Sequence, residues 1–157
     1  MATQTTATFP MSCGRVWIGV DCDNLTEISG KSGRVQDTSQ TRQTGDYYTL
    51  RGENALIEYG KKEPLTVSFE IVYNDEALEA YETVRALWET NGLGCGSPVC
   101  VRWSPGGEVG DQTFSMGTKF TQLVEFFYPP LDAQTGGPIV GTFRVKGPTI
   151  DVSVLAT

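Results

Sequence analysis

Residues 65–73 read LTVSFEIVY, and their alternation sets the fold class. Apolar and aromatic side chains at every second position are separated by mostly polar ones. The apolar set is Leu65, Val67, Phe69, Ile71 and Tyr73, and the other is Thr66, Ser68, Glu70 and Val72. Successive side chains of a strand point to opposite faces, so this period of two predicts a half-buried β-strand over 65–73.

An amphipathic helix is predicted directly after this strand, over about 75–91. Asn74 or Asp75 can cap its first turn, and Gly92 marks its end. An apolar arc opposite acidic side chains predicts a helix with one face on a sheet and one in solvent. The arc comprises Ala77, Leu78, Tyr81, Val84, Leu87 and Trp88, and the acidic side comprises Asp75, Glu79, Glu82 and Glu89.

Short strands and turns account for most of the remaining chain. RVWIGV at 15–20 is typical of a buried strand, and Val99, Val101 and Trp103 alternate with polar residues or cysteine. Further strands are predicted at 112–116, 119–128, 139–146 and 150–155, separated by turns rich in glycine and proline. This pattern predicts an α+β domain, mainly antiparallel β: a β-sandwich or barrel with one flanking helix.

The 157 residues predict a single domain with two polar segments. The first is an N-terminal arm at 1–12, rich in threonine. The second is a long polar loop at 29–54, which contains few aliphatic side chains. Loops longer than about 12–15 residues inside a compact domain are usually functional or disordered. The stretch 29–54 is therefore too long to be a simple connector.

Charge and composition weaken several function classes. The chain carries 12 basic and 19 acidic residues, a net charge of −7, and it has no histidine. A general nucleic-acid binder needs clustered lysine and arginine, which this balance disfavours. Without histidine there is no His-dependent triad or His-ligated metal. We therefore predict no enzymatic activity and no cofactor. The sequence shows no secretory signal and no apolar run of about 20 residues. We therefore expect synthesis in a cytosol, without association with a membrane.

Four cysteines, Cys13, Cys22, Cys95 and Cys100, leave several states open. An even number permits two disulfides, although small disulfide-rich scaffolds are usually denser in cysteine. The spacings of nine and five residues miss the short spacing that zinc sites favour. Free structural thiols are the preferred interpretation. A turn between Cys95 and Cys100 leaves late oxidation of that pair open.

Two clusters of carboxylates have simple structural interpretations. Asp21-Cys22-Asp23-Asn24 groups several oxygens but lacks the later ligands of a calcium loop, so an Asx-turn explains it better. Glu79, Glu82 and Glu89 share a solvated helix face, whereas a glycosidase needs carboxylates opposed across a cleft. We interpret them as a charged outer face.

Basic and aromatic residues within 29–54 are the candidate binding residues. Such a mixture can bind single-stranded nucleic acid, but nearby acidic residues almost balance its charge. Tyrosine and arginine are also enriched in protein–protein interfaces, so a protein partner is favoured over nucleic acid. A plain surface loop is the remaining alternative. The predicted subunit-interface residues are Arg34, Arg42, Tyr47, Tyr48 and Arg51.

The order of these elements is similar to that of a known family. A polar arm and a polar loop precede the strand PLTVSFEIVYN, which runs into the helix DEALEAYETVRALWETNG. The strand and turn VCVRWSPGG and the closing strands GTFRVKGPTIDVSV follow. This arrangement resembles the tail tube (major tail) proteins of long, non-contractile-tailed bacteriophages and, more loosely, the tube proteins of contractile injection systems.

The resemblance implies a structural virion protein. Copies would form hexameric rings that stack into a tube, with inner strands joined in a continuous barrel around a lumen that conducts DNA. The arm and the long loop would make contacts between rings. Partners would be the tape measure, terminator and distal tail proteins, and the location would be the virion tail, assembled in the host cytoplasm. The family offers no catalytic or metal-binding residues to carry over.

Two alternatives follow from the same sequence. The chain could be another virion component, such as a tail terminator or decoration protein, which does not stack without limit. It could also be a carbohydrate-binding module that uses Trp17, Trp88 and Trp103. Trp88 and Trp103 lie in apolar patterns, so both are expected in the core instead.

Overall fold

The computed structural model describes residues 13–89, 98–117, 120–133 and 136–156. The predicted arm at 1–12, Cys95 and the predicted helix end at Asn91 and Gly92 lie outside these ranges. The strands are β1 (Arg15–Gly19), β2 (Leu25–Glu27), β3 (Ser32–Gln36), β4 (Arg42–Tyr47), β5 (Leu56–Lys62), β6 (Leu65–Val72), β7 (Cys100–Ser104), β8 (Gln112–Met116), β9 (Gln122–Glu125), β10 (Val140–Gly147) and β11 (Asp151–Val154). The helix α1 (Ala80–Glu89) and a short 3-10 turn η2 (Ser29–Lys31) complete the elements.

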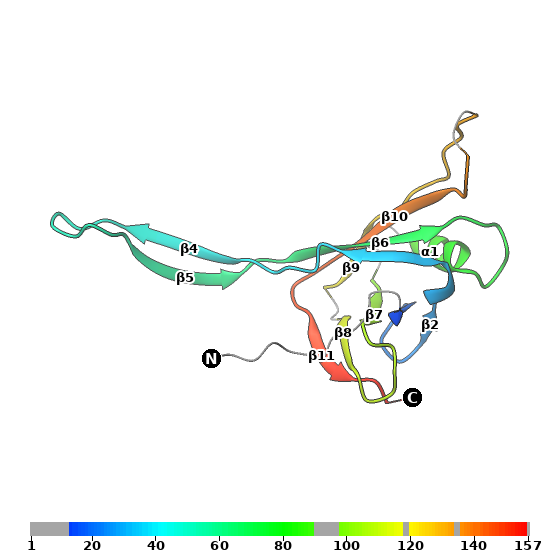
Figure 1. Cartoon of the computed structure of the whole chain (residues 1–157), viewed down its shortest axis with the longest axis horizontal. Helices are drawn as coiled ribbons and strands as arrows, with labels where there is room; N and C mark the ends of the chain where they lie inside the picture. Colours follow the sequence, from blue (N-terminus) through cyan, green and yellow to red (C-terminus); the bar gives the residue numbers. More distant parts are fainter. Residues whose placement is uncertain (1–12, 90–97, 118–119, 134–135, 157) are drawn as a thin grey trace, which may run out of the picture.

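Two antiparallel sheets face each other, and a third, two-stranded sheet extends from one of them (Figure 1). Sheet A has the strand order β11-β8-β7-β1-β2, and sheet B has the order β3-β6-β10-β9. The third sheet is the hairpin β4–β5. The predicted fold class, mainly antiparallel β with one flanking helix, is thus confirmed for the described residues.

Phe69 in β6 joins the two sheets through aromatic contacts. Its ring stacks on that of Phe143, its cross-strand partner in β10, with centroids 5.0 Å apart. Across the core it meets Trp103 of β7 edge-on, at 6.0 Å between centroids. Both phenylalanines are fully buried. Aromatic pairs in these geometries add to the free energy gained from burial, so this contact anchors sheet B on sheet A.

The predicted strand at 65–73 is confirmed as β6, the second strand of sheet B. Leu65, Val67, Phe69 and Ile71 are buried against the core, as the alternation indicates. Ser68 is buried on the opposite face, where its hydroxyl donates a hydrogen bond of 2.7 Å to the Asp37 carboxylate. The period of two therefore correctly predicts which side of β6 faces the core.

The helix is confirmed, but it begins five residues later than predicted, at Ala80. The Asn74 side chain accepts a hydrogen bond from the amide of Glu76, at 3.2 Å, within a turn that precedes α1. Leu78 has a φ of 70° and is 92% exposed, so it belongs to that turn and not to the apolar arc. Tyr81 and Val84 are buried, as the arc predicts.

The predicted polar loop at 29–54 is wrong as a description of the backbone. Its residues form η2, β3 and β4, and 56–62 form the unpredicted strand β5. β3 pairs with β6, and β4 pairs with β5. The residues of β4 and β5 are all exposed, so they carry no inside-to-outside pattern that would reveal a strand. Cross-strand backbone hydrogen bonds order this polar segment in place of a core.

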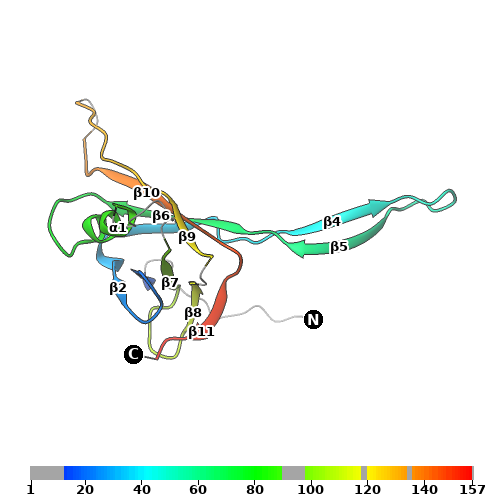
Figure 2. The same ribbon diagram turned by 180° about the vertical axis from the view of Figure 1, so that it is seen from behind.

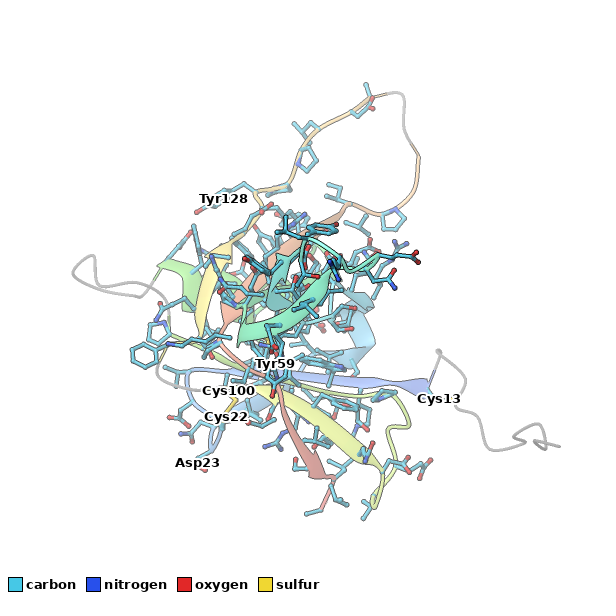
Figure 3. All side chains as sticks on the ribbon, turned by 90° about the vertical axis from the view of Figure 1, so that its left-hand side faces the viewer. Cys13, Cys22, Asp23, Tyr59, Cys100 and Tyr128 are labelled. Atoms are coloured by element: carbon cyan, nitrogen blue, oxygen red, sulfur yellow. A yellow bond between two sulfur atoms is a disulfide. The ribbon has the colours of Figure 1, made fainter. Side chains whose placement is uncertain are left out.

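Cys22 and Cys100 form a disulfide across 78 residues of sequence, so the interpretation as free thiols is wrong for these two (Figure 3). Pairing of β1 with β7 places Gly19 opposite Cys100, and this brings the turn with Cys22 over the start of β7. A Cβ at Gly117 would lie 2.1 Å from the Cys22 sulfur, so this close approach requires glycine there. Cys13 is a free, exposed thiol.

Cys22→Ser is expected to lower the free energy of unfolding by about 2–4 kcal/mol, because the crosslink restricts the unfolded chain over a long loop. Urea titrations of the variant and of the native protein with and without a thiol reductant measure this loss. Cys13→Ser serves as the matched control and should leave the midpoint unchanged. Equal stability of native and Cys22→Ser protein would contradict the stabilising role of the disulfide.

A bidentate ion pair secures β2 at the edge of sheet A. The Arg15 guanidinium donates to both carboxylate oxygens of Glu27, at 3.0 and 2.8 Å. The hydrogen bond from Arg15 is the main cause that holds the pKa of Glu27 below its ordinary value of 4.5. Both side chains are part-exposed, so solvent weakens the pair.

Glu27→Gln is expected to lower the melting temperature at neutral pH by roughly 2 °C. A carboxylate whose pKa is lower in the folded state stabilises above its unfolded pKa, and this contribution fades as the pH falls through the folded value. The difference between the variant and native protein should therefore shrink as the pH falls below the ordinary glutamate value of 4.5. Thermal melts across this range test it. Glu53→Gln, at an exposed carboxylate without an ion pair among the described residues, is the control.

Candidate assembly surfaces

The hairpin β4–β5 projects far beyond the two packed sheets (Figures 1 and 2). It continues the line of β3 and β6, since β4 follows β3 and β5 precedes β6 in the chain. Cross-strand pairs run from Arg42 opposite Lys62 to Tyr47 opposite Leu56. A two-stranded hairpin without packing partners is marginally stable in water. Its length and isolation therefore indicate a segment that packs on another molecule.

Apolar side chains are exposed on both faces of this hairpin. Directly opposed residues share a face, so Tyr47 and Leu56 lie on one side. Ile57 and Tyr59 lie on the other side with Thr44 and Asp46. Tyr47 is 70% exposed and Ile57 is 68% exposed. Contiguous exposed apolar surface of this kind commonly marks a protein-binding site.

Four of the five predicted interface residues lie on the hairpin, spread from its base to its tip. Arg42 and Tyr47 belong to β4, and Tyr48 and Arg51 belong to the connection at its tip. The Arg42 guanidinium lies 5.2 Å from the ring centre of Tyr59 and donates to the carbonyl of Gly60. The fifth residue, Arg34, lies apart from them on β3, with its Nε 3.9 Å from a Glu70 oxygen.

Sequence reasoning missed several apolar residues of this surface. Leu50, Leu56, Ile57 and Tyr59 are all exposed, and Leu50 at the tip is completely so. The alternation of Ile57, Glu58 and Tyr59 is a short strand signal. Gly60 and the lysines that follow interrupt it, which hides the strand.

Sheet B offers two edge strands for pairing. Among the described residues, β3 has a partner strand on one side only, namely β6. At the other edge, β9 pairs with β10, and one isolated bridge joins Gln122 to Pro98. Free strand edges are templates for pairing with another chain. The β3 edge is therefore open to pairing, whereas at β9 the residues Pro98 and Val99 already contact Gln122 and Thr121.

The solvent-facing side of sheet B has its charges largely in pairs. Arg144 of β10 lies 3.1 Å from Glu125 of β9, and Arg34 of β3 lies near Glu70 of β6. Lys146 has no ion pair within the described part of the chain. This face is thus mixed in sign, in contrast to the acidic balance of the whole chain.

The helix carboxylates are bound to an arginine. Arg85 donates to both Glu82 and Glu89 on the exposed side of α1. The hydrogen bond from Arg85 lowers the pKa of Glu82, and Glu82 in turn raises the pKa of Arg85. A general acid needs a raised pKa, so Glu82 does not suit that role. This agrees with the interpretation of a charged outer face.

The cluster at 21–24 is an Asx-turn, as predicted. One Asp21 carboxylate oxygen accepts hydrogen bonds from the amides of Asp23 and Asn24, at 2.9 and 3.0 Å. The Asn24 side chain also donates to it and is the main cause of a lowered Asp21 pKa. Among the described residues, no group of three potential protein ligands is arranged to hold a metal ion.

The tryptophans do not form a common platform. Trp103 is buried in the core, and Trp88 is part-buried against it. Trp17 lies on the outer face of sheet A, where the Arg15 guanidinium covers its ring at 4.7 Å. The core positions of Trp88 and Trp103 argue against a carbohydrate platform built from all three.

No helix in the described ranges is long and apolar enough to cross a bilayer.

Together these features define an antiparallel β-sandwich with a flanking helix, two exposed strand edges and a projecting hairpin. No protein-family model and no curated protein matches the chain. Solved structures do match. A chain of the extended sheath–tube complex of PVC, an extracellular contractile injection system, is 13% identical, with a TM-score of 0.71. The match covers 98% of this chain and all of the other.

Two further matches come from ends of such particles. The sheath/tube terminator of PVC is 12% identical, with a TM-score of 0.68, and the match covers 96% of this chain and 100% of that one. The tube-terminating cap of the anti-feeding prophage is 12% identical, with a TM-score of 0.65 over 98% and 96%. The chain therefore has the fold of tail-tube-like components of phage-related injection systems.

Ile57→Ala and Ile71→Ala form a matched pair that tests whether the hairpin surface contributes to the fold. Ile57 is 68% exposed on β5, and Ile71 is fully buried on β6. Ile71→Ala should cost about 2–5 kcal/mol of unfolding free energy. Ile57→Ala should change it by less than about 0.5 kcal/mol and reduce self-association. Urea titration and sedimentation velocity give the two readouts. Equal destabilisation by both would show that the hairpin packs within its own molecule.

Proposed function

We propose that the chain is a tail tube subunit, whose copies join into hexameric rings that stack into a hollow tube. The projecting hairpin carries this proposal, because its exposed apolar side chains need a partner that the monomer does not provide. The edge strands of sheet B, β3 and β9, would supply a second contact. The tail-tube-like fold supports the same role, and a chain with a similar fold occurs in the 6-fold symmetrised structure of the anti-feeding prophage baseplate.

Ring closure would use the edges of sheet B. Pairing β3 of one copy with β9 of the next makes a head-to-tail contact, and such contacts close into a ring when the rotation fits. The sheets of six copies would then form one continuous barrel with the polar face of sheet B on the lumen side. The paired charges of that face present no strongly basic surface to DNA phosphates. DNA would pass through the lumen without being retained.

Stacking would use the hairpin. Its apolar residues on both faces would be covered by subunits of the adjacent ring, with Arg42, Tyr47, Tyr48 and Arg51 in the contact. Arg34 would contribute at the ring-closing edge, since it lies on β3. Assembly would take place in the host cytoplasm, with the tape measure, terminator and distal tail proteins as partners in the virion.

A tail terminator is the second candidate function, because a terminator and a cap share this fold. A terminator forms a single ring and does not polymerise. The length of the particles separates the two roles.

Negative-stain electron microscopy of concentrated protein tests the proposal. The native chain should form rings with a central hole and tubes of many rings. A variant in which Asn-Gly replaces residues 43–61 should keep the fold, because Arg42 and Lys62 are cross-strand partners that a two-residue turn can join. This variant should yield at most single rings. Tubes of normal length from the variant would refute the role of the hairpin, and strictly monomeric native protein would refute the tube.

A further inference from the structure

An exposed leucine in a strained backbone conformation stands in the turn between β6 and α1. Leu78 has a φ of 70°, in the left-handed region that favours glycine and asparagine. Its side chain is 92% exposed, so it packs little against the described residues and gains little there to offset the strain. Strained residues of this kind concentrate at functional sites. Leu131 is equally exposed in another loop but has no such φ, which sets Leu78 apart.

Acidic residues flank Leu78 in the sequence. Asp75 and Glu76 are exposed, and Glu79 is part-buried. The amide of Glu79 donates a 3.4 Å hydrogen bond to the carbonyl of Glu76, closing the turn that presents Leu78 outward. We refer to residues 75–79 as the acidic knob. The acidic knob thus combines one exposed leucine with three acidic residues close to it in the chain.

An apolar hollow lies at the opposite end of sheet B. It measures about 230 Å³ and is lined by Pro64, Phe120, Gln122, Val124, Lys146, Gly147 and Pro148. Pro64 directly precedes β6, whereas the acidic knob follows its other end. One water takes up about 30 Å³ of liquid, so the hollow has room for an aliphatic side chain. Phe120 and Val124 expose apolar surface there.

Among the residues that line this hollow, Lys146 is the charged one. Lys146 lies on its rim without an ion pair among the described residues, and exposed Lys61 and Lys62 precede Pro64 in the chain. Glu63 is the acidic exception in this stretch. The acidic knob and the hollow are therefore complementary: in a contact between two copies, Leu78 would meet an apolar cavity and the acidic residues of the knob would meet Lys146.

We propose that the acidic knob of one copy docks in the hollow of a second copy, with Leu78 inserted between Phe120 and Val124. Because the two surfaces lie at opposite ends of sheet B, the contact is head-to-tail and repeats along an axis. It rests on the proposed tube function and adds a second contact between rings. It also assigns a role to Leu78, at which asparagine or glycine would suit the backbone better.

Leu78→Asn tests this contact, since asparagine tolerates a positive φ. The melting temperature of the monomer should stay equal or rise, while the protein concentration needed for stacking should increase by about tenfold or more. Leu131→Asn removes a similarly exposed leucine and is the matched control, expected to stack normally. Sedimentation and electron microscopy measure stacking. Normal stacking of Leu78→Asn, or equal loss in Leu131→Asn, would overturn the proposal.

A charge exchange provides the second test. Glu76→Lys and Lys146→Glu should each weaken stacking, most clearly at low salt, where charges are least screened. The double variant should regain part of the loss. No recovery would argue against docking in this hollow. Native protein that forms no rings or tubes would overturn both this contact and the tube. Native tubes with unaffected Leu78→Asn tubes would overturn the contact alone.

Discussion

Contact between Phe69, Phe143 and Trp103 holds sheet B on sheet A, and the outer features of the molecule depend on it. Phe69 lies in the middle of β6, the strand that also continues from β5 and the hairpin. A hairpin without its own core needs a rigid base, and β6 provides one because its apolar side is fully buried. The same packing sets the positions of the edges β3 and β9. The core thus positions surfaces that themselves contribute little to it.

Several groups that a monomeric protein normally buries or pairs are exposed in this molecule. Apolar side chains are exposed on both faces of the hairpin, and within the described ranges the edge strand β3 pairs on one side only. Natural proteins usually protect such edges against unwanted pairing. Retaining them makes sense where pairing between copies is the function. An exposed strand edge would promote aggregation of a monomer, whereas in a tube it would join neighbouring copies.

The disulfide between Cys22 and Cys100 depends on the pairing of strands that are far apart in sequence. Cys22 and Cys100 meet because β1 pairs with β7, and Gly117 leaves space for the two sulfur atoms. Spacing along the chain drew attention to Cys95 and Cys100 instead, since only a short turn separates them. Pairing of strands that are far apart in sequence cannot be read from local patterns. The hairpin was also missed, for a different reason. Its polar strands are ordered by pairing with each other and not by burial, so little alternation marks them in the sequence.

Local patterns were enough for β6, for most of the other core strands and for the existence of α1, because burial on one face leaves a periodic trace in the chain. They also located Arg42, Tyr47, Tyr48 and Arg51 in one segment that became the hairpin. Strand pairing in space settled the partner of Cys22 and the place of Arg34 on β3, and such contacts between distant residues leave no periodic signal along the chain. The later start of α1 and the exposure of Leu78 come from a local turn after β6, which the apolar periodicity did not reveal.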